Sequence, residues 1–189
     1  MRIGIIGAGF SGRAVARLAM LRGHEVMLSN CENPAMQASA MLRCAVGTPE
    51  AAAAFGDIVL LVVPLRWVQD IAPGMLAGKI VVDAGDYGLA CSSEFVAERL
   101  VGARVVKALN VILEKDIEKH ARPAGSVDRR AIPIAGDDEQ VKETISGLLD
   151  QLGFDVVDAG PLAEGWRFAQ GFGEPLDRAG LVRALGDAG

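Results

Sequence analysis

The stretch Gly7-Ala8-Gly9-Phe10-Ser11-Gly12 decides the fold prediction, because its glycines have the spacing GxGxxG. It directly follows an apolar run at residues 2–6 that is typical of a strand. It opens residues 10–22, whose apolar side chains recur at helical spacing, and a second strand is predicted at residues 25–29. A strand, this motif, a helix and a strand within about thirty residues are the context in which GxGxxG indicates dinucleotide binding.

Each glycine of the motif has a physical role. Gly7 allows a tight turn, Gly9 lets a pyrophosphate approach the backbone, and Gly12 lets the helix pack closely on the strand. Unpaired N–H groups at the start of the helix attract phosphate. We therefore predict that the cofactor contacts Gly7, Ala8, Gly9, Phe10 and Ser11. The alternative is a glycine-rich turn that binds nothing.

The rest of the chain alternates between expected strands and helices. This order predicts an α/β fold, a Rossmann-type doubly wound and mostly parallel sheet with helices on both faces, plus a small C-terminal βαβ extension. Residues 110–130 are expected to form a long irregular connection. We divide the chain into a dinucleotide-binding Rossmann domain at 1–112 and a C-terminal α/β extension and tail at 113–189 that packs on the same sheet. Further strands are expected at 57–63, 79–83, 104–108, 131–135 and 154–157, and helices at 34–43, 48–55, 65–75, 93–101, 137–152 and 181–185.

Composition excludes several classes of protein. The net charge of −5 argues against bulk electrostatic binding of nucleic acid. The longest apolar run, residues 58–65, is too short to cross a membrane. The three cysteines lie far apart without a CxxC motif, so we expect no metal site and a reducing, cytoplasmic setting. Glycine is abundant, at 23 of 189 residues, and it separates the apolar runs.

The choice between NAD and NADP stays open. Glu32 stands twenty residues after Gly12, near the place where NAD sites carry an acid for the ribose 2′-hydroxyl. Ser29 and Asn30 end the second strand and could instead donate hydrogen bonds to a 2′-phosphate. Glu32 could equally be a solvated loop charge.

Ligands of open parallel sheets bind beyond the carboxyl ends of the strands, and Ala84 and Asn110 follow two of these ends. Asn110 could bond a nicotinamide or satisfy a turn. Lys107 is a candidate base, although a strand-end lysine is more often a surface charge. The two histidines, His24 and His120, are expected to be a turn residue and a solvated residue. Hydride transfer between two cofactors needs no strong acid or base, so no catalytic side chain is predicted.

Several motifs together resemble one family, the NADP oxidoreductases that depend on the deazaflavin coenzyme F-420. The resemblance covers about residues 1–168, and its more specific parts lie in the second half of the chain. The motifs are residues 1–12, residues 23–30, Asp57-Ile-Val-Leu-Leu-Val-Val-Pro64, Val105-Val-Lys-Ala-Leu-Asn110, Ile134-Ala-Gly-Asp-Asp138, Leu152-Gly-Phe-Asp-Val-Val-Asp-Ala-Gly-Pro-Leu162 and Ala163-Glu-Gly-Trp-Arg-Phe168.

The resemblance implies a homodimer that transfers a hydride between NADP and a deazaflavin. It implies a ribose phosphate near Ser29 and Asn30, a nicotinamide near Val63, Pro64 and Leu65, and a deazaflavin near Gly160, Pro161, Leu162 and Trp166. The chain departs from the family pattern at Glu32, where the family has arginine, and at residues 85–87.

Three functions therefore remain. The first is an oxidoreductase that passes a hydride between NAD(P)H and a small planar acceptor, by resemblance a deazaflavin or flavin. The second is a non-catalytic dinucleotide-binding module or redox sensor. The third is an imine or ferric reductase built on the same dinucleotide-binding half.

Overall fold

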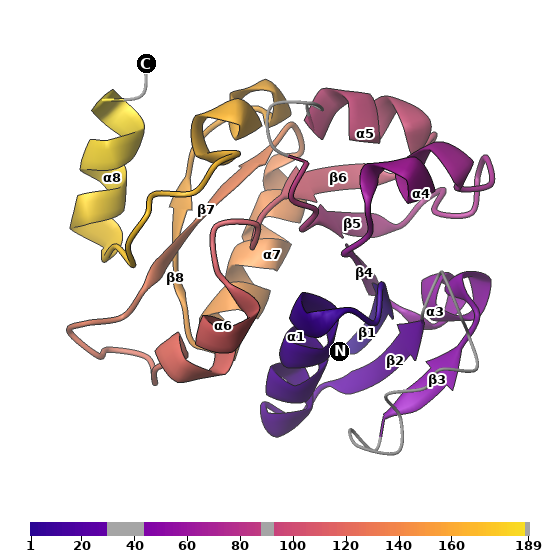
Figure 1. The fold of residues 1–189 in the computed structure, drawn as a ribbon, viewed down its shortest axis with the longest axis horizontal. Helices are drawn as coiled ribbons and strands as arrows, with labels where there is room; N and C mark the ends of the chain where they lie inside the picture. The colour runs from indigo at the N-terminus through magenta and orange to yellow at the C-terminus, as the bar shows by residue number, and fades with distance from the viewer. Residues whose placement is uncertain (30–43, 88–92, 188–189) are drawn as a thin grey trace.

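The computed structural model describes residues 1–29, 44–87 and 93–187. One sheet of eight strands runs through it in the order β3-β2-β1-β4-β5-β6-β7-β8 (Figure 1). The strands are β1 (Arg2–Ile6), β2 (Glu25–Ser29), β3 (Ala45–Gly47), β4 (Ile58–Leu61), β5 (Ile80–Asp83), β6 (Arg104–Lys107), β7 (Ala131–Gly136) and β8 (Asp155–Asp158).

Strand β1 lies at the point where the strand order reverses. It pairs in parallel with β2 on one side and with β4 on the other, so the chain winds outward to β3 and then crosses back. At the carboxyl edge of the sheet, the loop after β1 therefore leads to one face and the loop after β4 leads to the other. This is the place where open α/β sheets bind ligands, and the predicted Rossmann-type fold is confirmed.

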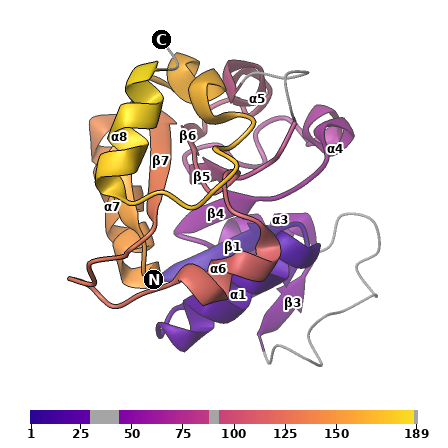
Figure 2. The same ribbon diagram turned by 60° about the vertical axis from the view of Figure 1, so that its left-hand side comes forward.

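Helices cover both faces of the sheet. One face carries α1, α6 and α7, which pack on one apolar core, and the other carries α3, α4, α5, the 3-10 helix η2 and α8. Figures 1 and 2 both show α1 and α6 side by side. The helices are α1 (Phe10–Leu21), α3 (Pro49–Phe55), α4 (Leu65–Asp70), α5 (Ser93–Arg99), α6 (Glu114–His120), α7 (Glu139–Leu152), η2 (Leu162–Phe168) and α8 (Arg178–Asp187).

Strand β7 runs against the direction of β6. It pairs antiparallel to β6, with Val106 opposite Gly136, while β8 pairs in parallel with β7 across helix α7. The expected C-terminal βαβ unit is therefore present but inverted. Its strands end at the edge of the sheet opposite to the carboxyl ends of β1, β4, β5 and β6.

The structure adds three elements that the sequence did not indicate, α6, β3 and η2. Helix α6 lies in the connection expected to be irregular. Its sequence has no helical apolar pattern, because Ile117 is its one buried apolar residue and the remaining residues are charged or polar. It is held by packing on α1 and by the ion pair of Arg17 with Glu118, 3.2 Å. Strand β3 has only three residues, too few for an alternating pattern. The helix expected at 34–43 lies outside the described residues.

Across the described residues, none of the helices is both long enough and apolar enough to span a bilayer.

Replacing Phe154 by alanine tests the core beneath α7. Phe154 is fully buried among the side chains of α7 and β7, and we expect its removal to lower the free energy of unfolding by about 3–5 kcal/mol. Phe10, which is 73% exposed, is the matched control, and Phe10→Ala should leave the denaturation midpoint nearly unchanged. Equal losses for the two variants would contradict this account of the core.

Candidate functional site

The loop between β1 and α1 is closed by two contacts that only glycine permits. Gly7 has a φ of +121°, and a Cβ there would lie 2.0 Å from the carbonyl oxygen of Val62. A Cβ at Gly12 would lie 1.9 Å from the carbonyl oxygen of Gly7. The Gly7 N–H also donates to the Ser29 carbonyl, 2.9 Å. The loop is therefore packed against the ends of both neighbouring strands.

Gly9 differs from the other two glycines of the motif because it faces open space. A Cβ at Gly9 would meet nothing within 4 Å among the described residues. Gly9 is the N-cap of the twelve-residue helix α1, which has no side-chain cap and no acid in its first turn. Its first N–H groups and the positive end of the helix dipole are thus available to an anion.

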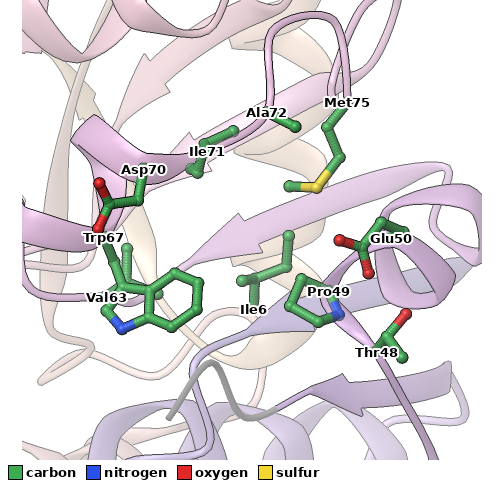
Figure 3. Close-up of a pocket in the computed structure, with 10 residues that line it drawn as sticks. All are labelled: Ile6, Thr48, Pro49, Glu50, Val63, Trp67, Asp70, Ile71, Ala72 and Met75. Carbon is green, nitrogen blue, oxygen red and sulfur yellow. The ribbon is translucent and has the colours of Figure 1, made fainter.

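A hollow of about 340 Å³ opens on the α3 and α4 face of the sheet, and we call it the α3–α4 hollow (Figure 3). Figure 3 shows the Trp67 indole opposite Pro49, with Ile6 between them. The hollow is therefore largely apolar and wide enough for a flat ring. It is lined by Ile6, Thr48, Pro49, Glu50, Val63, Trp67, Asp70, Ile71, Ala72 and Met75.

Two further hollows adjoin on the opposite face. The α1–α6 hollow measures about 160 Å³, the C-terminal hollow about 290 Å³, and they share Asp86, Asn110 and Leu113. The first is otherwise lined by Ser11, Val15, Val62, Ala84, Leu109, Ile112, Glu114 and Ile117, and the second by Val111, Asp116, Arg130 and residues 169–175. The two hollows are therefore neighbours that share part of their lining.

The glycine loop lies between the two faces. Ile6, which precedes the loop, lines the α3–α4 hollow, and Ser11, which follows it, lines the α1–α6 hollow. Val63 and Val62 likewise line different hollows, since successive residues of an extended chain point to opposite faces. An extended ligand crossing the edge of the sheet at Gly9 would reach both hollows.

Asn110 presents an acceptor without a partner. Its Nδ2 donates to the Phe168 carbonyl, 2.9 Å, while its Oδ1 is buried and has no hydrogen-bond partner among the described residues. The preceding residue, Leu109, has a φ of +67°, which is unusual for a branched side chain. Unusual backbone of this kind tends to cluster at functional sites. Asn110 is thus turned toward the hollows by the chain at the end of β6.

A buried ion pair fixes the segment between β5 and α5. Lys107 is 4% exposed and Asp83 is fully buried, and their Nζ and Oδ2 atoms lie 3.2 Å apart. Lys107 also donates to the Gly85 carbonyl, 2.5 Å, and Asp83 accepts from the Tyr87 hydroxyl, 3.1 Å. Lys107 is therefore neither a surface charge nor a lining residue of the hollows. Its register opposite Asp83 on adjacent strands is the signal that sequence reasoning missed.

The remaining nucleotide residues named from the sequence are dispersed. Pro64 is the exposed N-cap of α4, and Leu65 packs partly buried in the apolar core on that face. Ser29 is fully buried, and its hydroxyl has no partner among the described residues. Asn30 and Glu32 lie outside the described residues. The nicotinamide position expected at residues 63–65 thus lies on the other face from Ala84 and Asn110.

The segment expected to contact the acceptor lies away from the three hollows. Gly160 accepts a hydrogen bond from the Gly136 N–H, and Leu162 donates to Asp137, so Gly160, Pro161 and Leu162 lie at the edge opposite the glycine loop. The reason is the inverted direction of β7 and β8. Trp166, 57% exposed on η2, also lines none of the three hollows. Residues 169–175, which follow η2, are the tail residues that reach the carboxyl edge.

Both histidines are held neutral by their surroundings. Burial lowers the pKa of His24, and burial together with the Arg130 guanidinium lowers the pKa of His120. The His120 Nδ1 lies 2.9 Å from Arg130 Nη1, so this residue is paired and partly buried rather than solvated as expected. In the described segments, no group of three or more His, Cys, Asp or Glu side chains is arranged to hold a metal ion.

The comparisons with known proteins place the chain in the class of NAD(P)-dependent oxidoreductases, and its fold is the Rossmann type. Within that class, residues 2–87 match the model of the family described as NADP oxidoreductase, coenzyme F420-dependent, and the predicted resemblance is confirmed.

The chain is also similar to individual proteins. The chain is 28% identical over 173 residues to metalloreductase STEAP3 of Rattus norvegicus, covering 86% of this chain and 34% of that protein. It therefore spans about a third of the length of this relative. A hypothetical protein from Sinorhizobium meliloti superposes with a TM-score of 0.76 at 27% identity, over 94% of this chain and 92% of the other.

Two more distant structures share the fold. A candidate F420-dependent NADP reductase from Arthrobacter superposes with a TM-score of 0.77 at 23% identity, covering 90% of this chain and 89% of that chain. An imine reductase from Myxococcus stipitatus, in complex with NAD+, gives a TM-score of 0.68 at 20% identity, covering 99% of this chain and 60% of that chain.

Replacing Lys107 by methionine tests the buried ion pair. The change leaves the Asp83 carboxylate buried without its countercharge, and we expect a loss of about 3–5 kcal/mol of stability in chemical denaturation. The double variant Lys107→Met/Asp83→Asn should recover much of this loss, since no charge then remains buried. Lys115→Met, on the exposed side of α6, should stay within about 0.5 kcal/mol of the parent. A small effect of Lys107→Met alone would show that the pair does not fix the segment.

Proposed function

We propose that the chain binds NAD(P)H across the glycine loop and passes its hydride to a planar acceptor. The observation that carries this proposal is the open backbone at Gly9, at the start of α1, between hollows on the two faces of the sheet. The adenosine end would lie in the α3–α4 hollow, and the nicotinamide end in the α1–α6 hollow.

The described residues fit such a cofactor. The N–H groups at the start of α1 would bind the pyrophosphate. Trp67 and Pro49 would flank a flat base that packs on Ile6, and the unpaired Oδ1 of Asn110 would accept a hydrogen bond from a carboxamide. Each part of the dinucleotide thus meets a surface of matching polarity.

The side chains position the reactants rather than take part in proton transfer. The bound nicotinamide supplies the hydride. Val62, Leu109 and Ile112 give the α1–α6 hollow an apolar wall against which the ring would pack. Asn110, held by its bond to the Phe168 carbonyl, would orient the ring against the boundary of the C-terminal hollow.

The acceptor would occupy the C-terminal hollow. This hollow adjoins the α1–α6 hollow through Asp86, Asn110 and Leu113, and residues 169–175 close its other side. By family resemblance the acceptor is a deazaflavin or a flavin. We also propose the division into residues 1–112 and 113–189, a cytoplasmic setting and a homodimer. The exposed apolar residues Trp166 and Val182 on η2 and α8 support the dimer.

The acceptor assay separates this proposal from its rivals. Oxidation of NADH and NADPH is followed by absorbance with a deazaflavin, a flavin, a ferric chelate and a cyclic imine. Turnover with a deazaflavin or flavin supports the proposal, whereas selective turnover of the chelate or the imine favours a ferric or imine reductase. Binding of a dinucleotide without any turnover would establish the non-catalytic module instead.

Replacing Gly9 by alanine tests the cofactor position directly. Because a Cβ at Gly9 meets nothing, the fold should keep its melting temperature, while dinucleotide affinity should fall by about tenfold or more, which is ~1.4 kcal/mol. Gly147→Ala is the matched control, since Gly147 is exposed within α7 and also faces open space. This control should gain about 0.5–1 kcal/mol of stability and keep its affinity. Unchanged affinity in Gly9→Ala would overturn the placement of the pyrophosphate.

A further inference from the structure

Strand β3 brings the start of α3 close to the position where Rossmann proteins bind the adenosine ribose of a dinucleotide. Gly47, the last residue of β3, lies opposite Ser29, the last residue of β2. Rossmann proteins read the adenosine ribose at the end of the second strand. Thr48 directly follows β3, Glu50 lies in the first turn of α3, and both line the α3–α4 hollow. They therefore adjoin that position from the neighbouring strand.

The charge of the α3–α4 hollow is negative. Its described lining contains two acids, Glu50 and Asp70, and no lysine or arginine. Figure 3 shows the Glu50 carboxylate between Pro49 and Met75 at the rim of the hollow. A hydrogen bond from the Thr48 side chain lowers the pKa of Glu50, so this carboxylate is ionised at neutral pH.

The sequence between β2 and β3 adds no net charge. Residues 30–44 contain one acid, Glu32, and one base, Arg43. The negative charge that bears on the cofactor is therefore that of the described lining, Glu50 and Asp70.

This charge discriminates between the two dinucleotides. NADP differs from NAD by a 2′-phosphate, which carries nearly two negative charges at neutral pH. A carboxylate about 4 Å from one such charge in water lowers affinity by roughly fivefold, and several acids act together. A free ribose hydroxyl instead donates a hydrogen bond to a carboxylate.

We propose that this site selects NAD(H) over NADP(H), and that Glu50 is a specificity-determining residue for that choice. The inference rests on the proposed function, because it assigns the adenosine end to the α3–α4 hollow. It departs from the NADP preference that the family description implies.

Dissociation constants of NADH and NADPH for the whole chain, measured by the fluorescence of the dinucleotide, test this inference. We expect the parent to bind NADH at least tenfold more tightly than NADPH. Glu50→Gln should strengthen NADPH binding by about three- to fivefold and leave NADH nearly unchanged, and the gain should shrink at high ionic strength. Glu50→Lys should strengthen NADPH binding further.

A matched control keeps the charge change but moves it away from the hollow. Glu98→Gln, on the exposed side of α5, should leave the ratio of the two constants unchanged. Melting temperatures of all variants show whether each one is folded.

The outcomes separate the inference from the proposed function. Tighter binding of NADPH by the parent would overturn the inference and leave the proposed function standing. A ratio that Glu50→Gln and Glu50→Lys both leave unchanged would overturn the role of Glu50. Absence of binding by either dinucleotide would overturn the proposed function itself.

Discussion

The contact between Gly7 and the Val62 carbonyl is the constraint on which the site depends. At this point β1 and β4 are paired and the chain must turn into α1, so no side chain fits between the two backbones. The close approach fixes the start of α1 at the edge of the sheet. It also places Val62 at the α1–α6 hollow and Val63 at the α3–α4 hollow, on opposite faces of the sheet. The division of the site into hollows on opposite faces follows from this backbone contact.

A second constraint acts where β5 and β6 end. A buried ion pair is seldom a net gain over apolar residues of the same volume, but removing one partner is strongly destabilising. The pair of Asp83 and Lys107 therefore fixes the local conformation more than it adds to the free energy of unfolding. Through the Gly85 carbonyl and the Tyr87 hydroxyl it holds residues 84–87, and so it positions Ala84 and Asp86 at the α1–α6 hollow.

Local patterns in the sequence predicted the strands near the centre of the sheet and the glycine loop well. β1 and β2 have the expected bounds because apolar runs ended by glycine or polar residues are local signals. The direction of β7 is set by its pairing with β6, which no local pattern reports, and this pairing is what takes residues 160–162 away from the described hollows. Helix α6 depends on its packing against α1, and β3 on its pairing with β2. Glu50 escaped notice because the strand before it is too short to detect.

Asn110 bonds the carbonyl of Phe168, and the tail beyond that bond forms much of the C-terminal hollow without belonging to any strand. Insertions or substitutions in residues 169–175 can reshape that hollow while the sheet and the glycine loop stay intact. If the C-terminal hollow holds the acceptor as proposed, this architecture would let a lineage exchange its acceptor while it keeps its dinucleotide. Divergence among relatives is accordingly expected to concentrate in the tail, and the nucleotide half to change slowly.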